Sequence, residues 1–160
     1  LVRLWKGEQS LELPAILRLA NLQVQRKNSA DAIKNFEKGV EILLNQEKPE
    51  AKLVSDFTKD FSKTLINENQ TASAIQFLNK IINKFGEQLP MAEEKYLLGD
   101  LYFKNGETKN AERAWQQIKD DSTGIYQKMA QEKLQQAKWD EGYKKHIKRI
   151  PAMSKSEEFK

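Results

Sequence analysis

The feature of this chain that most limits its fold is a pattern that occurs three times. In each copy an alanine is followed four residues later by a large apolar residue: Ala32 by Phe36, Ala74 by Leu78, and Ala111 by Trp115. The alanines are 42 and 37 residues apart. Self-similarity at such a period is typical of stacked helical hairpins. We expect the alanine to let two helices approach closely and the large residue to fill the space beside the contact.

The spacing of apolar residues elsewhere also predicts helices. Apolar residues recur every three or four positions, and we find no convincing stretch of strict alternation. Leu, Ala, Glu, Lys and Gln dominate, and all of them favour helices. The sequence therefore predicts an all-α protein with helices near 11–26, 30–45, 50–68, 71–85, 90–104, 108–119 and 124–149.

Several residues indicate where these helices begin and end. We expect Ser10 to cap the first helix and Pro14 to lie in its first turn, where no intrahelical N–H bond is lost. Gly86 and Gly106 suit left-handed positions after helix ends. Pro151 is expected to end the last helix.

One stretch, Tyr96 to Trp115 ("YLLGDLYFKNGETKNAERAW"), resembles a tetratricopeptide (TPR) repeat. That repeat carries a helix with W-x2-L-G-x2-Y, a turn, and then A-x3-F. Leu98-Gly99, Tyr102, Ala111 and Trp115 match this pattern, while Lys95 stands where the first Trp is usual. Weaker copies cover 13–46 and 55–88, beside the best copy at 92–125.

The resemblance implies a right-handed α-solenoid of three TPR-like helical hairpins plus a C-terminal capping helix. The array would span 11–125, the capping region 126–151 and a flexible tail 152–160. Residues 1–10 would be a linker or the end of a preceding helix. The chain would then be the C-terminal part of a larger protein.

By the same resemblance, the first helices of the hairpins form a concave groove that holds a segment of a protein partner. The residues that would line it are Asn21, Gln25, Lys59, Lys63, Asn67, Tyr96, Asp100, Phe103 and Lys104. Tyr96 and Phe103 could instead simply pack on the final helices. Some family members clamp a chaperone's C-terminal carboxylate, but here Leu17, Asp60, Glu93 and Leu97 replace the cations or amides of that clamp. The resemblance thus implies a scaffold or adaptor; the alternative is a self-associating structural module of a larger assembly.

The sequence offers no constellation for catalysis or metal binding. It has no Cys and one His, His146, which cannot form a zinc site alone. Paired carboxylates such as Glu93-Glu94 are sequence neighbours and suit a helix start. No phosphate-binding or nucleophile motif occurs. We therefore expect a protein without enzymatic activity, without a cofactor and without a metal site.

The C-terminal region carries the whole excess of positive charge. Residues 1–125 are balanced, whereas 126–149 have seven basic and three acidic side chains. Met129, Leu134 and Ala137 form a stripe that could cover the third repeat. We predict a second, buried stripe of Trp139, Tyr143, Ile147 and Ile150, packed on the solenoid or on a partner, with Lys144, Lys145, Lys148 and Arg149 facing outward. The stripe and these cations are also candidate partner-binding residues.

The simplest interpretation of this basic helix is a capping helix whose lysines face solvent. The alternatives are that it docks on an acidic protein, on nucleic acid or on a membrane. The cations have no aromatic residues interleaved for base stacking, which disfavours nucleic acid. No apolar run reaches the ~20 residues that span a bilayer. The compartment stays open: the run "WDEGYKKHIKRIP" is similar to the ends of bacterial envelope repeat proteins, which favours the periplasm or cell envelope over the cytoplasm.

Overall fold

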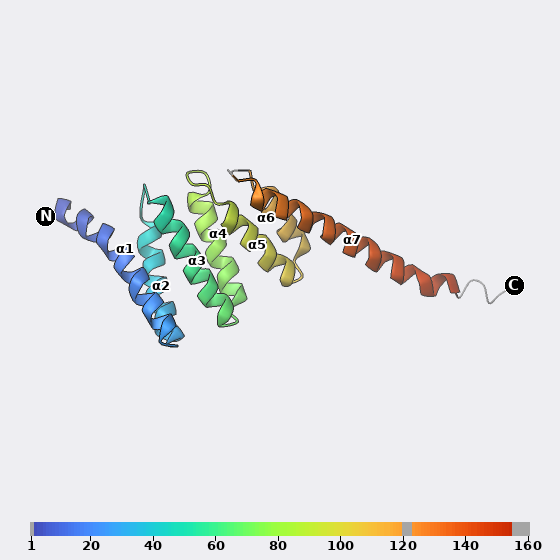
Figure 1. The fold of residues 1–160 in the computed structure, drawn as a ribbon, viewed down its shortest axis with the longest axis horizontal. Coiled ribbons are helices and arrows are strands. Elements are labelled where there is room, and N and C mark those ends of the chain that lie inside the picture. Colours follow the sequence, from blue (N-terminus) through green and yellow to red (C-terminus); the bar gives the residue numbers. More distant parts are fainter. Residues whose placement is uncertain (1, 120–122, 155–160) are drawn as a thin grey trace.

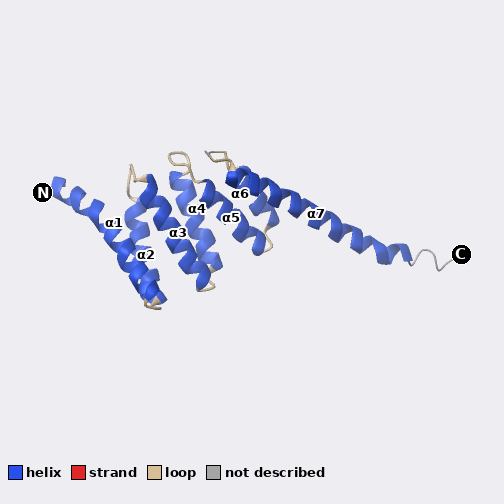
Figure 2. Cartoon of the chain, viewed as in Figure 1, coloured by secondary structure: helices blue, strands red, loops and turns tan. Residues whose placement is uncertain are grey.

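The computed structural model describes residues 2–119 and 123–154, and the side chains of 12–119 and 123–148. Within these residues the chain is helical and has no strand. Short loops join the helices, which follow one another along the long axis of the molecule (Figures 1 and 2). The helices are α1 (Val2–Gln25), α2 (Ser29–Leu44), α3 (Ala51–Asn67), α4 (Thr71–Phe85), α5 (Ala92–Lys104), α6 (Thr108–Gln116) and α7 (Ile125–Ser154).

The helices form three hairpins and one further helix. α1 packs on α2, α3 on α4, and α5 on α6. Each first helix also contacts the first helix of the next hairpin, so α1, α3, α5 and α7 neighbour one another in order. This stacking places the two ends of the chain at opposite ends of the molecule (Figure 1). The expected solenoid of three hairpins is confirmed.

The three hairpins turn in the same way. Lys27, Asn69 and Gly106 each have a positive φ, of 59°, 58° and 81°. In each turn the next N–H bonds back to a carbonyl five residues earlier, for example Asn28 N to Gln23 O at 2.9 Å. This is the Schellman arrangement that ends many helices. The left-handed residue stands five positions before the repeated alanine in every copy.

The repeated alanines lie at the helix contacts, as expected. Ala32, Ala74 and Ala111 are all fully buried. Gly99 faces Trp115 across the third hairpin, and a Cβ on Gly99 would overlap the indole ring. The Trp115 Nε1–H donates to the Tyr96 carbonyl oxygen at 3.2 Å. A small residue on α5 thus allows the large ring on α6 to lie against the α5 backbone.

Two hydrophobic clusters hold the stack together. The larger one extends from α1 to α6 and contains four packed rings, from Phe36, Phe57, Phe61 and Phe77, with centroids 4.7–6.4 Å apart. The smaller one surrounds Trp115 and reaches α7. Gly39 belongs to the larger cluster: a Cβ there would lie 2.5 Å from the Phe57 ring.

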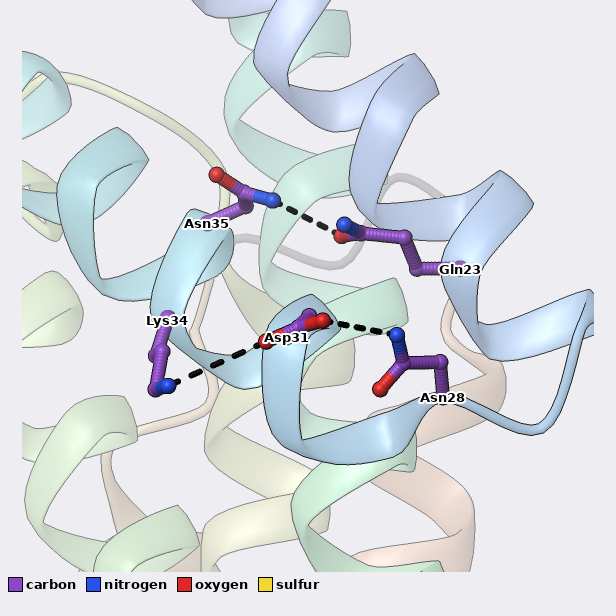
Figure 3. Close-up of polar contacts among 5 residues, drawn as sticks. All are labelled: Gln23, Asn28, Asp31, Lys34 and Asn35. Atoms are coloured by element: carbon purple, nitrogen blue, oxygen red, sulfur yellow. Dashed lines mark hydrogen bonds and ion pairs between the residues drawn. The ribbon is translucent and has the colours of Figure 1, made fainter.

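Polar contacts at the first turn fix α1 against α2 (Figure 3). Asn35 Nδ2 donates to Gln23 Oε1 at 2.7 Å and joins the two helices. Asn28 Nδ2 donates to Asp31 Oδ2 at 2.7 Å, and Lys34 Nζ lies 3.8 Å from Asp31 Oδ1. These last two contacts are local to the start of α2, and they leave Asn28 without a side-chain bond to the helix backbone.

Three expectations about helix ends are wrong. α1 runs unbroken from Val2 with Pro14 in its interior, so Ser10 does not begin a helix. α7 continues through Pro151 to Ser154. An interior proline removes one helical hydrogen bond and crowds the carbonyl four residues earlier, yet α1 continues past Pro14, whose side chain is exposed to solvent. Gly86 has a helical φ of −65° and donates its N–H to the Ile82 carbonyl oxygen, so it extends α4 and does not reverse the chain.

Candidate binding surface

The odd-numbered helices present the surface on which the sequence placed a groove. We call this surface, formed by α1, α3, α5 and the start of α7, the odd-helix face. All nine residues expected to line the groove lie on α1, α3 or α5. The structure divides most of them among three places along this face, and Lys63 and Asn67 lie elsewhere on α3.

The first place is a hollow between α1 and α3, which we call the α1–α3 cavity. Its volume is about 470 Å³, and Asn21, Gln25 and Lys59 contribute to its lining. Asn21 Nδ2 donates to Asp60 Oδ2 at 2.6 Å and links the two helices across it. Three of the expected groove residues are therefore brought together here.

The α1–α3 cavity also contains residues that the sequence pattern did not single out. Leu22 and Leu53 give it apolar walls, while Arg18 and Asp56 place opposite charges at its rim. Leu22 keeps 45% of its surface exposed. Arg18, Leu22 and Gln25 are spaced by four and three residues, so the helical period contained the signal that Arg18 and Leu22 share a side with Gln25.

The second place is the contact between α3 and α5. Lys59 Nζ lies 3.6 Å from Glu93 Oε1, and both side chains are largely exposed. Ser55 Oγ donates to Glu94 Oε1 at 3.2 Å. Glu94 is buried, and burial is the main cause that raises the pKa of its carboxyl above the ordinary value. Lys63 and Asn67 are exposed further along α3; Asn67 lines a separate hollow near the first hairpin turn.

The third place is the contact between α5 and α7. Asp100 lies 2.7 Å from Lys104 Nζ and 3.9 Å from Lys133 Nζ, so its carboxylate connects α5 to α7. Tyr96 packs against Tyr126 of α7, with ring centroids 6.0 Å apart. Burial, followed by the charge of Asp100, raises the pKa of the Tyr96 hydroxyl. Lys133 is a contributor that the sequence pattern missed.

Tyr96 and Phe103 are both half-buried. Phe103 packs on Trp115 with centroids 5.8 Å apart, and Tyr96 borders a cavity of about 240 Å³ with Met129 of α7. The open part of the odd-helix face therefore lies mainly over α1 and α3, while α7 covers much of α5.

The first half of α7 packs on the third hairpin, whereas its second half does not. Ala130 and Ala137 are buried and Leu134 is half-buried, but Met129, expected in the same stripe, is exposed. Trp139, Tyr143 and Ile147 keep 69%, 53% and 46% of their surfaces exposed. Of the two alternatives predicted for this second stripe, packing on the solenoid is wrong, because α7 projects past the end of the third hairpin (Figure 1); burial against a partner stays a prediction. Lys144, Lys145 and Lys148 are exposed, as expected; the side chains of Arg149 and Ile150 lie outside the described residues.

No cluster of three or more residues suited to hold a metal ion occurs in the described part of the chain. Across 2–119 and 123–154, no helix combines the length and hydropathy needed to cross a bilayer.

The match to a known sequence family concerns the third hairpin. The sequence pattern of the tetratricopeptide repeat matches residues 95–122, which include most of α5, all of α6 and the left-handed Gly106 between them. The third hairpin therefore matches a tetratricopeptide repeat. Such repeats generally mediate protein–protein interaction and are typically non-enzymatic.

The fold of this chain is similar to that of a solved structure. The crystal structure of MamA superposes with a TM-score of 0.50 at 19% sequence identity, covering 84% of this chain and 81% of that chain. At this identity the likeness concerns the fold alone. No curated protein matches the sequence.

Proposed function

We propose that this protein is a non-enzymatic adaptor that holds a segment of a protein partner on its odd-helix face. The observation that carries the proposal is the α1–α3 cavity. It is open to solvent, has leucine walls at Leu17, Leu22 and Leu53, and has both charge signs at its rim. Apolar walls with a few placed polar groups are what recognition sites generally use.

The composition of the cavity indicates the kind of segment it accepts. Its charged rim residues Arg18 and Lys59 are matched by Asp56 and Asp60. A peptide segment whose charges all have the same sign would be repelled there as strongly as it is attracted. We therefore propose a segment with one or two apolar side chains flanked by polar residues of both signs.

The test uses peptides selected from a random-sequence display library for binding to the full chain. Leu22→Ser should weaken their binding about tenfold, the equivalent of about 1.4 kcal/mol of lost apolar contact. Leu19→Ser is the matched control, because Leu19 lies on the same helix with a similar exposed fraction of 48% and outside the cavity lining. Isothermal titration calorimetry measures both affinities. Equal affinities for the two variants, with melting temperatures unchanged, would remove the α1–α3 cavity as the binding site.

A further inference from the structure

The second half of α7 is a segment that the proposed adaptor function does not use. Ala137 is the last buried residue of the described part of α7. From Lys138 to Lys148 the side chains are exposed, except the half-buried Asp140. This part of the helix extends away from the hairpins (Figure 1), so one side of it can approach another surface without hindrance from the solenoid.

One side of this segment is apolar. Trp139, Tyr143 and Ile147 are spaced by four residues and form a line, which we call the α7 stripe. The Trp139 and Tyr143 rings are stacked, with centroids 5.6 Å apart and planes 3° from parallel. The two rings thus pack against each other while both residues keep more than half of their surface exposed to solvent.

The same segment is basic. Residues 138–149 contain five basic and two acidic side chains. Helical spacing places Lys145 and Lys148 toward the side of the helix opposite the α7 stripe, and Lys144 on the flank of the stripe, about 60° around the helix from Ile147. Glu141 lies 2.9 Å from Lys145, and that contact lowers the pKa of the Glu141 carboxyl, so one of the two acidic groups is paired.

The area of the α7 stripe limits what can cover it. Stable protein interfaces bury about 1,200 Å² or more, whereas a fully buried aromatic side chain contributes only about 150–250 Å². The three partly exposed side chains of the stripe, even counted on two copies of the chain, fall short of that area. A lipid surface needs no such area, because a short apolar face inserts while lysines bind anionic headgroups.

We propose that residues 138–148 of α7 dock on an anionic lipid surface. The α7 stripe enters the boundary between headgroups and acyl chains, where Trp and Tyr rings are preferred. The long aliphatic part of each lysine side chain extends toward the headgroup layer, so that its ammonium group contacts lipid phosphates. The hairpins remain outside the bilayer and the odd-helix face stays accessible.

The experiment is flotation of the full chain with two kinds of vesicle. One contains equal parts of phosphatidylglycerol and phosphatidylcholine, and the other contains phosphatidylcholine alone. We expect the chain to float with the anionic vesicles only, and high salt to release it because screening weakens the lysine–phosphate attraction. Binding of equal strength to both vesicles, or to neither, would overturn the proposal.

Two sets of variants locate the contact. The first replaces the α7 stripe (Trp139→Ser, Tyr143→Ser and Ile147→Ser), and its control is Leu19→Ser on α1. The second removes three charges (Lys144→Gln, Lys145→Gln and Lys148→Gln), and its control removes three exposed lysines elsewhere (Lys34→Gln, Lys38→Gln and Lys80→Gln).

We expect each α7 set to weaken anionic-vesicle binding at least about tenfold, since each lysine near such a surface contributes about 1 kcal/mol. The controls should change it less than about twofold. Circular dichroism verifies that every variant is folded. Loss of binding in the lysine control to the same degree would show a general charge effect and overturn the proposal. So would self-association in sedimentation that the stripe variant abolishes, because a second copy would then cover the stripe.

Discussion

At Gly99 the missing side chain is a requirement of the third hairpin, because the Trp115 ring occupies the space of a Cβ. Gly99→Ala should lower the free energy of unfolding by about 1–3 kcal/mol, the usual cost of overpacking a core. Urea denaturation measures it. Gly142→Ala is the control, since nothing lies within 4 Å of a Cβ at that helical position; there alanine should stabilise the helix slightly. Equal effects of the two variants would contradict the close α5–α6 contact.

Lys27 occupies the left-handed position that Gly106 occupies in the third hairpin. A non-glycine residue in this conformation is strained by about 1–2 kcal/mol, and glycine avoids that strain. Glycine's greater freedom in the unfolded chain offsets part of this gain in stability. Lys27→Gly should therefore raise the free energy of unfolding by about 0.5–1 kcal/mol. Asn69→Gly should give a smaller gain, because asparagine tolerates this conformation better. Urea denaturation of both variants checks the order; a loss in Lys27→Gly would mean that the turn differs from the Schellman geometry.

Glu94 links the stability of the α3–α5 contact to pH. Its carboxyl has a raised pKa in the folded chain and an ordinary value, near 4.5, in the unfolded chain. Between these values the folded state holds more protons, so the free energy of unfolding decreases as pH rises through that window and is then constant. Glu94→Gln, which can still accept the Ser55 hydrogen bond, should raise the melting temperature at neutral pH and leave it unchanged below pH 4.5.

A matched substitution checks that this effect belongs to the buried site. Glu87 is an exposed carboxylate in the loop after α4. Glu87→Gln should leave the melting temperature unchanged at both pH values. If it shifted the melting temperature as much as Glu94→Gln does, a general change in net charge, and not burial of Glu94, would be responsible.

Among the helices, α7 combines two different halves. Its first half contributes Ala130 and Ala137 to the third hairpin, whereas the described part of its second half, from Lys138 to Lys148, contributes no buried side chain. Truncation after Lys138 should therefore change the melting temperature of the hairpins little, while it removes anionic-vesicle binding. Calorimetry and flotation measure the two results. A marked drop in melting temperature would mean that the α7 stripe packs on the solenoid in solution.

In the described part of the chain the molecule is a stack in which the main contacts of each helix are with its near neighbours. Stability in such arrays is close to a sum of local terms, and regions can open separately. The Trp115 cluster and the larger phenylalanine cluster are joined mainly through α5, where Tyr102 packs on both.

Hydrogen exchange should reveal this division. In the Gly99→Ala variant, amides of α5, α6 and the first half of α7 should exchange faster, while those of α2 and the α3–α4 hairpin keep most of their protection. The wild-type chain under the same conditions is the reference. Uniform loss of protection along the chain would mean that the stack unfolds as one cooperative unit.

Local patterns were sufficient to predict the helical hairpins. The three alanines and their large partners identified the helix contacts, and helical periodicity located seven helices, because burial of one helix face leaves a regular trace in the residues. Left-handed turns were predictable at Gly106, where the residue type fits the geometry, but not at Lys27, where tertiary packing of α1 on α2 imposes a conformation that lysine does not favour.

The sequence alone could also place the nine candidate groove residues on the odd-numbered helices, because the resemblance assigned a role to each helix. It could not decide how open the face is at each place. That depends on α7, whose path covers Tyr96 and leaves the α1–α3 cavity free. The path of α7 also determines that Trp139 and Tyr143 are exposed. An apolar stripe signals a surface that burial would stabilise, but only the direction of α7 relative to the hairpins determines whether the chain itself provides the cover.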